Sequence, residues 1–149
     1  WGLANTEAML AGTPIIANTT GGMQDQMRFV DENGEWFTPS ADIPSNHRGT
    51  YKEHGEWAFP VYPTSRSIQG SPPTPYIFDD RCQPEDAAVQ LKKLYDLGRE
   101  ERKRLGSLGS EFCKENLMTS KAMGQEFISS MDGAFDNWKP KPKYTMEAV

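Results

Sequence analysis

The first 25 residues constrain the fold more than any other part of this 149-residue chain. Glycine turns alternate there with short regular patterns. Gly2 precedes an apolar helical pattern over residues 3–10, Gly12 stops that pattern, and the strand-like run Ile15-Ile16-Ala17 follows. A Gly21-Gly22 turn then opens a second helical pattern. This order is half of a nucleotide-binding α/β unit, in which helix N-termini favour anions because their N–H groups and dipoles point at the ligand.

Local signals continue the alternation of elements beyond this stretch. We expect a helix over residues 23–30, a turn at Asn33-Gly34 and a short strand over residues 35–38. Further along, Tyr76-Ile77-Phe78 predicts a strand that returns to the core.

Residues 38–75 have a different character. Seven of the chain's eleven prolines fall within them, and no helical period survives. The sequence therefore predicts a long irregular insert, since a structureless stretch of this length is usually a functional segment or a lid. Its aromatic residues argue against simple disorder. Trp57 and Tyr62 could stack on a sugar ring, or they could form a small core of the insert itself.

The last third of the chain is predicted to be helical. Gln83 and Pro84 have the residue types of a helix start, and Thr119 opens a later helix that ends near Asn137. Residues 139–149 are predicted to be a flexible tail. The expected apolar stripes are Ala88, Leu91, Leu94 and Tyr95 in the first helix, Leu105, Leu108 and Phe112 in the second, and Met123, Phe127, Met131, Phe135 and Trp138 in the third.

Composition narrows the classes of function. The formal net charge of −5 argues against a nucleic-acid partner, because no excess of Lys and Arg is available for phosphates. No apolar run approaches the roughly 20 residues that span a bilayer, so we expect no transmembrane segment and a cytoplasmic location. We expect no metal site, because the candidate ligands lack the necessary spacing and suit strand ends, surface positions or buried thiols: Asp79, Asp80, His47, His54, Cys82 and Cys113.

The opening motif resembles the C-terminal domain of retaining GT-B glycosyltransferases of the group 1 family, with a likeness to glycogen and starch synthases at its second turn. The resemblance covers residues 1–37 and, more weakly, residues 76–138. It implies an α/β fold with a partial Rossmann-like parallel sheet, the second half of a GT-B C-terminal domain, over residues 1–138 with an insert at 38–75. The agreeing segments are Trp1-Gly2-Leu3, Glu7-Ala8-Met9, Ala11-Gly12-Thr13-Pro14, Ile15-Ile16-Ala17 and Thr20-Gly21-Gly22-Met23-Gln24-Asp25.

The resemblance also implies a function for the full-length protein. Such enzymes transfer a sugar from a nucleotide-diphosphate-sugar donor to an acceptor, here unknown, with retention and with neither metal nor cofactor. Backbone amides at Leu3 and Ala4 would meet phosphate, and Glu7 would meet the ribose hydroxyls. The implied donor-site residues are Gly2, Leu3, Ala4, Glu7, Thr20, Gly21 and Gly22. The family's first motif glutamate would stand two residues before Trp1, so we expect an N-terminally truncated fragment that is inactive alone, with unknown catalytic residues.

The same residues also fit other interpretations. Glu7 could be only a favourable partner of a helix dipole, and Thr20-Gly21-Gly22 could be only a cap and turn. The chain could be a non-catalytic α/β interaction module whose insert binds a partner. A different Rossmann-like enzyme lacks support, because no Gly-x-Gly-x-x-Gly is present. A truncated sheet would also expose an apolar edge near Ile15 and Ile16, so we expect self-association through that edge or through the C-terminal helix.

Overall fold

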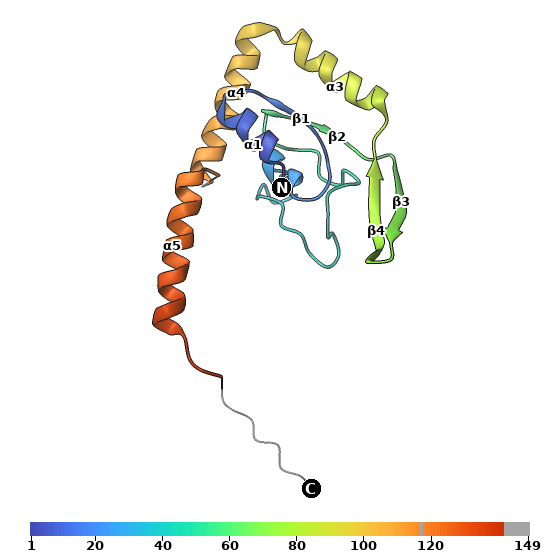
Figure 1. Cartoon of the computed structure of the whole chain (residues 1–149). Helices are drawn as coiled ribbons and strands as arrows, with labels where there is room; N and C mark the ends of the chain where they lie inside the picture. Colours follow the sequence, from blue (N-terminus) through green and yellow to red (C-terminus); the bar gives the residue numbers. More distant parts are fainter. Residues whose placement is uncertain (117, 142–149) are drawn as a thin grey trace. The chain divides into compact units, whose positions relative to one another are not determined.

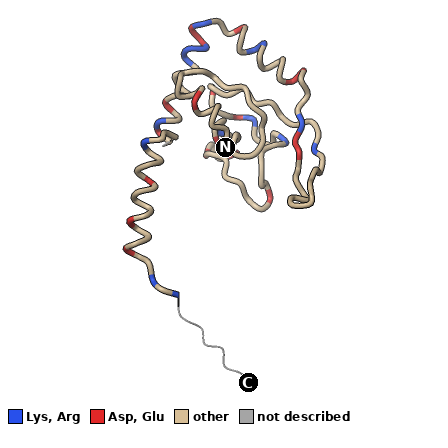
Figure 2. Tube along the Cα trace, in the orientation of Figure 1, with Lys and Arg blue, Asp and Glu red and all other residues tan. Residues whose placement is uncertain are grey.

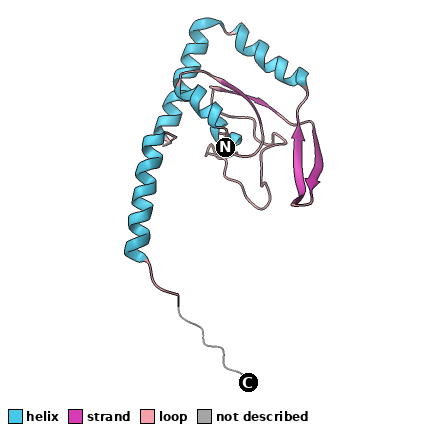
Figure 3. Ribbon diagram, in the orientation of Figure 1, coloured by secondary structure: helices cyan, strands magenta, loops and turns pink. Residues whose placement is uncertain are grey.

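The computed structural model describes residues 1–116 and 118–141, which form helices and strands in two units, Trp1–Asn116 and Leu117–Val149 (Figures 1 and 3). The first unit holds α1 to α4 and all four strands, and the second holds α5. The elements are α1 (Leu3–Leu10), β1 (Ile15–Asn18), α2 (Met23–Met27), β2 (Ala58–Val61), β3 (Ser65–Ser71), β4 (Thr74–Arg81), α3 (Pro84–Asp96), α4 (Gly98–Glu115) and α5 (Ser120–Asn137).

A parallel pair, β1 and β2, is the centre of the first unit. Ile15 lies opposite Ala58 and Asn18 lies opposite Val61. The pair is bounded by hydrogen bonds from Ile15 N to Trp57 O and from Thr19 N to Val61 O, both 2.9 Å. Helices and a parallel pair confirm the predicted α/β class in its coarse form. The finer assignment, a Rossmann-like sheet, stays a prediction.

The helix predicted over residues 3–10 is confirmed as α1, and it packs closely on α4. Gly12 ends α1 with a φ of +76°, a left-handed conformation that favours glycine. A Cβ atom at Gly106 of α4 would lie only 1.8 Å from Gly12 O, so only glycine permits this approach. Ser110, one turn further along α4, donates a hydrogen bond from Oγ to Leu10 O at 3.2 Å. Backbone proximity therefore fixes α4 against the end of α1.

Aromatic side chains join the sheet to α4. Trp57 is 8% exposed and stacks on Phe112 with ring centroids 4.6 Å apart. Trp36 meets the same ring edge-on at 5.6 Å, and Trp57 Nε1 donates to Gln26 O at 3.0 Å. Trp57 is therefore a core residue of the whole unit. It is neither a sugar platform nor part of a separate core confined to the insert.

The region from residue 23 to residue 38 differs from the prediction. The helix predicted to reach residue 30 ends at Met27, because Arg28 turns left-handed with a φ of 51°. Phe29 thereby enters the core and is 1% exposed. The strand predicted over residues 35–38 is reduced to a single antiparallel bridge between Val30 and Trp36. The turn between them is confirmed, with Gly34 at a φ of +81°.

The insert predicted as irregular over residues 38–75 is only partly irregular. β2 lies within it, and this strand is half of the central sheet. β3 lies within it too and forms an antiparallel hairpin with β4. The sequence pattern favours only a short extended segment at Trp57-Ala58-Phe59, and Pro60 argues against a strand that continues to Val61. Pro60 lacks an N–H donor, and its carbonyl accepts a hydrogen bond from Gln90 Nε2 of α3 at 2.8 Å.

The strand predicted at Tyr76-Ile77-Phe78 exists as part of β4, but it does not return to the core. It pairs with β3 in a hairpin that is separate from the central sheet (Figure 3). Tyr76 is 84% exposed and Phe78 is 62% exposed. Periodicity and β-propensity identified the strand, but they did not reveal which strand it pairs with.

α3 presents a different face from the predicted one. Gln83 and Pro84 start it as predicted, with Glu85 and Asp86 in the first turn. The half-buried side chains are Ala87, Gln90 and Leu94. Of the predicted stripe, only Leu94 contributes, while Leu91 and Tyr95 are 60% and 77% exposed. The hydrogen bond from Gln90 to Pro60 shows which side of the helix faces the sheet.

α5 is confirmed by itself as the predicted helix ending at Asn137. Thr119 caps it, since its Oγ1 accepts a hydrogen bond from Ala122 N at 3.2 Å. The predicted flexible tail lies outside the described residues from residue 142 onward. None of the helices within residues 1–116 and 118–141 combines the length and the apolar character needed to cross a membrane.

Candidate functional site

The N-terminus of α1 is open. Gly2 occupies the N-cap position, and in the described part of the chain no side chain caps this helix. The first intrahelical bond runs from Thr6 N to Gly2 O at 3.2 Å, so the amides of Leu3 and Ala4 precede the bonded turns. These two amides point along the helix axis, where the positive end of the dipole favours an anion.

Gln26 fixes the start of α1 against α2. It is fully buried, and its Nε2 lies 2.7 Å from Gly2 O and 2.6 Å from Thr6 Oγ1. Trp1 Nε1 donates to the same threonine hydroxyl at 3.1 Å, and Asn5 Nδ2 donates to Gln26 Oε1 at 3.3 Å. A single buried amide therefore orients both helices. Nothing in the sequence signalled this role.

The two glycine turns meet. A Cβ atom at Gly22 would lie 3.0 Å from Trp1 N, so the second turn packs against the residue that opens the first. Gly21 is exposed and adopts a φ of +50°. Both turns lie beyond the carboxyl end of β1, which is where α/β sheets bind ligands.

A shallow pocket of about 240 Å³ adjoins the second turn. It is lined by Gly21, Gly22, Gln24, Asp25, Phe37, Pro39, Pro44 and Ser45. Burial raises the pKa of the Asp25 carboxyl. Gln24 connects the two sides of the pocket, because its Nε2 donates to Ser45 Oγ at 2.9 Å and its Oε1 accepts from Asn46 N at 2.7 Å. Part of the predicted insert thus borders the turn.

Thr20 ties the second turn to the hairpin. Its Oγ1 donates to Asp80 Oδ2 at 3.0 Å, and Arg66 Nη2 donates to the same oxygen at 2.9 Å. These hydrogen bonds, with that from Arg66 first, hold the pKa of Asp80 below its usual value. Neighbouring Asp79 pairs with Arg81 instead. The Asp79-Asp80 pair thus belongs to two ion pairs, and the described residues contain no group of three acidic, Cys or His side chains arranged to hold a metal.

Glu7 lies on the outward side of α1. Leu3 and Glu7 are both exposed and are four residues apart, so they share a face, while Thr6 and Met9 are buried on the other. Within the described residues, no ion pair involves Glu7. It also stands beyond the first turn of α1, which weakens the interpretation of Glu7 as a simple dipole partner.

Two buried polar atoms lack a hydrogen-bond partner within the described residues: Thr19 Oγ1 and His47 Nδ1. Thr19 directly precedes the second turn and is fully buried. His47 is half-buried rather than at the surface as expected, and burial lowers its pKa, with the positive charge of Arg66 acting in the same direction. His54 is also half-buried and packs edge-on against Phe29 at 5.9 Å.

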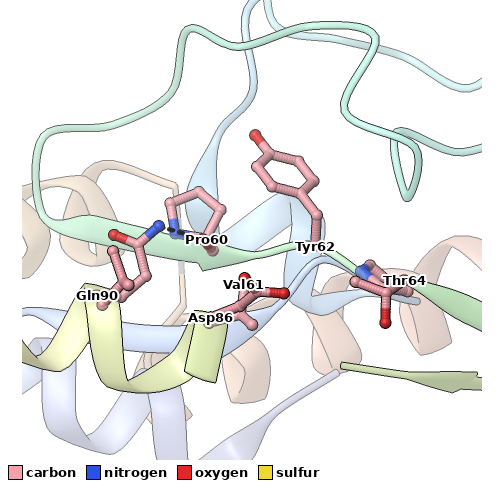
Figure 4. Close-up of a pocket in the computed structure, with 8 residues that line it drawn as sticks. Pro60, Val61, Tyr62, Thr64, Asp86 and Gln90 are labelled. Atoms are coloured by element: carbon pink, nitrogen blue, oxygen red, sulfur yellow. Dashed lines mark hydrogen bonds between the residues drawn. The ribbon is translucent and has the colours of Figure 1, made fainter. Parts of the chain in front are cut away.

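A second shallow pocket of about 230 Å³ lies between the carboxyl end of β2 and α3 (Figure 4). In the close-up, Pro60 and Tyr62 extend to one side of β2 and Val61 to the other, with Asp86 and Gln90 contributed by α3. Burial raises the pKa of Tyr62. This pocket adds polar groups near the end of the second parallel strand, but it shares no lining residue with the glycine turns.

The structure unites some predicted site residues and separates others. Gly2 and Gly22 lie together through Trp1 and Gln26, as described above. Glu7 and Thr20 make no hydrogen bond to each other in the described part of the chain: Glu7 is exposed on α1, and Thr20 donates a hydrogen bond to Asp80.

Comparison with protein-family models, curated proteins and solved structures finds no match to the chain.

Proposed function

We propose that this chain contributes part of the donor site of a retaining glycosyltransferase that uses a nucleotide-diphosphate sugar. The observation that carries the proposal is the meeting of the open α1 N-terminus with the Gly21-Gly22 turn beyond the carboxyl end of β1. The family motif named above, which spans both turns, supplies the reaction class.

In this proposal backbone amides provide most of the electrostatic stabilisation of the leaving group. The amides of Leu3 and Ala4 stabilise the diphosphate as it gains negative charge on leaving the sugar. Gly21, which has no side chain, lets the donor approach the backbone closely. The exposed carboxylate of Glu7 accepts hydrogen bonds from two vicinal ribose hydroxyls.

In this proposal the residues named above bind the donor, and the catalytic residues are unassigned. Because the proposal assigns only part of a donor site to these residues, we expect nucleotide binding to be weak.

Nucleotide binding tests the proposal directly. We expect UDP, GDP or ADP, or one of their sugar conjugates, to shift the amide NMR signals of Leu3, Ala4, Gly21 and Gly22 at millimolar concentration. Glu7→Gln should weaken that binding at least about tenfold, because it removes charged hydrogen bonds to the ribose. Glu85→Gln is the matched control, since Glu85 is also an exposed helical glutamate.

Two results would contradict the proposal. One is the absence of any shift at these amides with all three nucleotides, which would favour the non-catalytic interaction module. The other is equal weakening by Glu7→Gln and Glu85→Gln, which would remove Glu7 from the site.

A further inference from the structure

One face of the β3–β4 hairpin presents large apolar side chains to solvent. Ile68 lies opposite Phe78 and Arg66 lies opposite Asp80, so all four share a face with Tyr76. Ile68 is 63% exposed, Phe78 is 62% exposed and Tyr76 is 84% exposed. Exposed aromatic side chains gathered on one face mark a binding surface more often than scattered ones do.

The base of this hairpin face is fixed to the proposed donor site. Asp80 accepts hydrogen bonds from Thr20 and Arg66, and the Arg66 guanidinium lies 5.1 Å from the centroid of the Phe78 ring. Thr20 is followed directly by Gly21 of the donor turn. From Asp80 to Tyr76 the strand advances about 13 Å, so the face leads outward from that turn.

The hairpin face carries no net charge. Residues 67–78 contain no Lys, Arg, Asp or Glu, and the hairpin tip is accordingly uncharged along its trace (Figure 2). At its base, Arg66 and Asp80 neutralise one another. An uncharged aromatic surface does not suit nucleic acid or an anionic membrane, both of which require excess positive charge.

We propose that this hairpin face binds a neutral oligosaccharide, the acceptor of the sugar transfer. The inference rests on the proposed function. The C–H faces of successive sugar rings pack on Phe78 and Tyr76, while sugar hydroxyls hydrogen-bond to the Tyr76 hydroxyl and to the Arg66–Asp80 pair. The end of the oligosaccharide nearest Thr20 then lies beside the turn that holds the donor.

The size of the hairpin face favours a saccharide over a second protein. Three large side chains bury roughly 450–750 Å² even when they are fully covered. A stable protein interface needs about 800 Å² from each partner. The opposite face of β4 adds little, because Ile77 is flanked there by Asp79 and Arg81.

Saccharide binding to the full chain tests the inference. The probes are maltohexaose, cellohexaose and mannohexaose, followed by saturation-transfer NMR and by the amide signals of β3 and β4. We expect at least one probe to bind, and the double variant Tyr76→Ala/Phe78→Ala to weaken it at least about tenfold. Ile77→Ala, on the opposite face of the same strand, is the matched control and should leave binding unchanged.

The outcomes separate this inference from the donor-site proposal. Nucleotide binding with no binding of any hexasaccharide overturns the hairpin inference and leaves the donor site standing. Saccharide binding that is unaffected by the double variant also overturns it. A double variant that converts a dimer to a monomer, with no saccharide bound, assigns the face to self-association and overturns it as well. Circular dichroism of each variant verifies that the hairpin change leaves the fold intact.

Discussion

The two halves of the predicted insert both contain proline and bulky apolar side chains, but they lie in opposite environments. The first half, up to the end of β2, is anchored in the core by two buried side chains, those of Trp57 and Asn46. The second half forms β3, where every residue is exposed. The first half is also the richer in charged residues, so charge content does not predict which half is buried.

What separates them is the partner of each strand. β2 pairs with β1 and accepts a hydrogen bond from Gln90 of α3, whereas β3 pairs with its hairpin neighbour β4. A lone two-stranded hairpin buries little surface and is only marginally stable. Its stability here depends on side chains at its base, where Thr20 and Arg66 donate hydrogen bonds to Asp80.

The largest expected contrast comes from truncating one aromatic in each half. Trp57→Ala should lower the free energy of unfolding by about 3–5 kcal/mol, because it leaves a cavity beside Phe112. Tyr76→Ala should change it by less than about 0.5 kcal/mol, since that ring is exposed. Urea unfolding monitored by circular dichroism measures both. Similar losses in the two variants would show that the hairpin is packed more tightly than its exposure indicates.

Removing the buried side-chain amide of Asn46 should give the next largest loss of stability. Asn46 Oδ1 accepts from Tyr51 N at 2.9 Å, and its Nδ2 donates to Tyr51 O at 3.0 Å. Asn46→Ala leaves both backbone groups without partners and should cost about 1–3 kcal/mol. Asn18→Ala, at an exposed position, is the control and should be nearly neutral in the same urea experiment. If Asn46→Ala left the free energy of unfolding unchanged, the loop around Asn46 would not be anchored in the core.

The smallest expected change in the free energy of unfolding comes from Asp80 at the base of the hairpin, and this change depends on pH. Asp80→Asn should cost about 1 kcal/mol at neutral pH, a modest value because Arg66 is partly solvated. The folded-state pKa of Asp80 is lowered, so its contribution is complete above the unfolded value of about 4. That contribution is lost as the pH falls through the folded pKa.

Unfolding measured across this pH range in both proteins tests the effect. The stability difference between the natural chain and Asp80→Asn should shrink below about pH 4. A difference that stayed constant with pH would assign the loss to packing rather than to the ion pair with Arg66. Asp136→Asn, in the other unit, serves as a control for general charge effects.

Local elements were well predicted wherever glycine, proline or a capping residue marks a boundary. Gly12 and Gly34 require left-handed backbone, and Pro84 and Thr119 start helices as expected. The donor-site residues were likewise proposed from a continuous motif. The interactions that hold them could not be predicted, because Gln26 acts through buried contacts with residues 20 and 24 positions away.

The sequence by itself determined the opening order of helix, strand and helix and the two glycine turns, because steric limits on the backbone act over a few residues. Only the tertiary structure decided that β2 completes the sheet, that Trp57 belongs to the core and that Thr20 is bonded to Asp80. These choices depend on which surfaces meet, since strand pairing and burial join segments 40 or more residues apart. The turns of the opening motif thus follow from its own residues, whereas the side chains that surround the motif are set by contacts between distant segments.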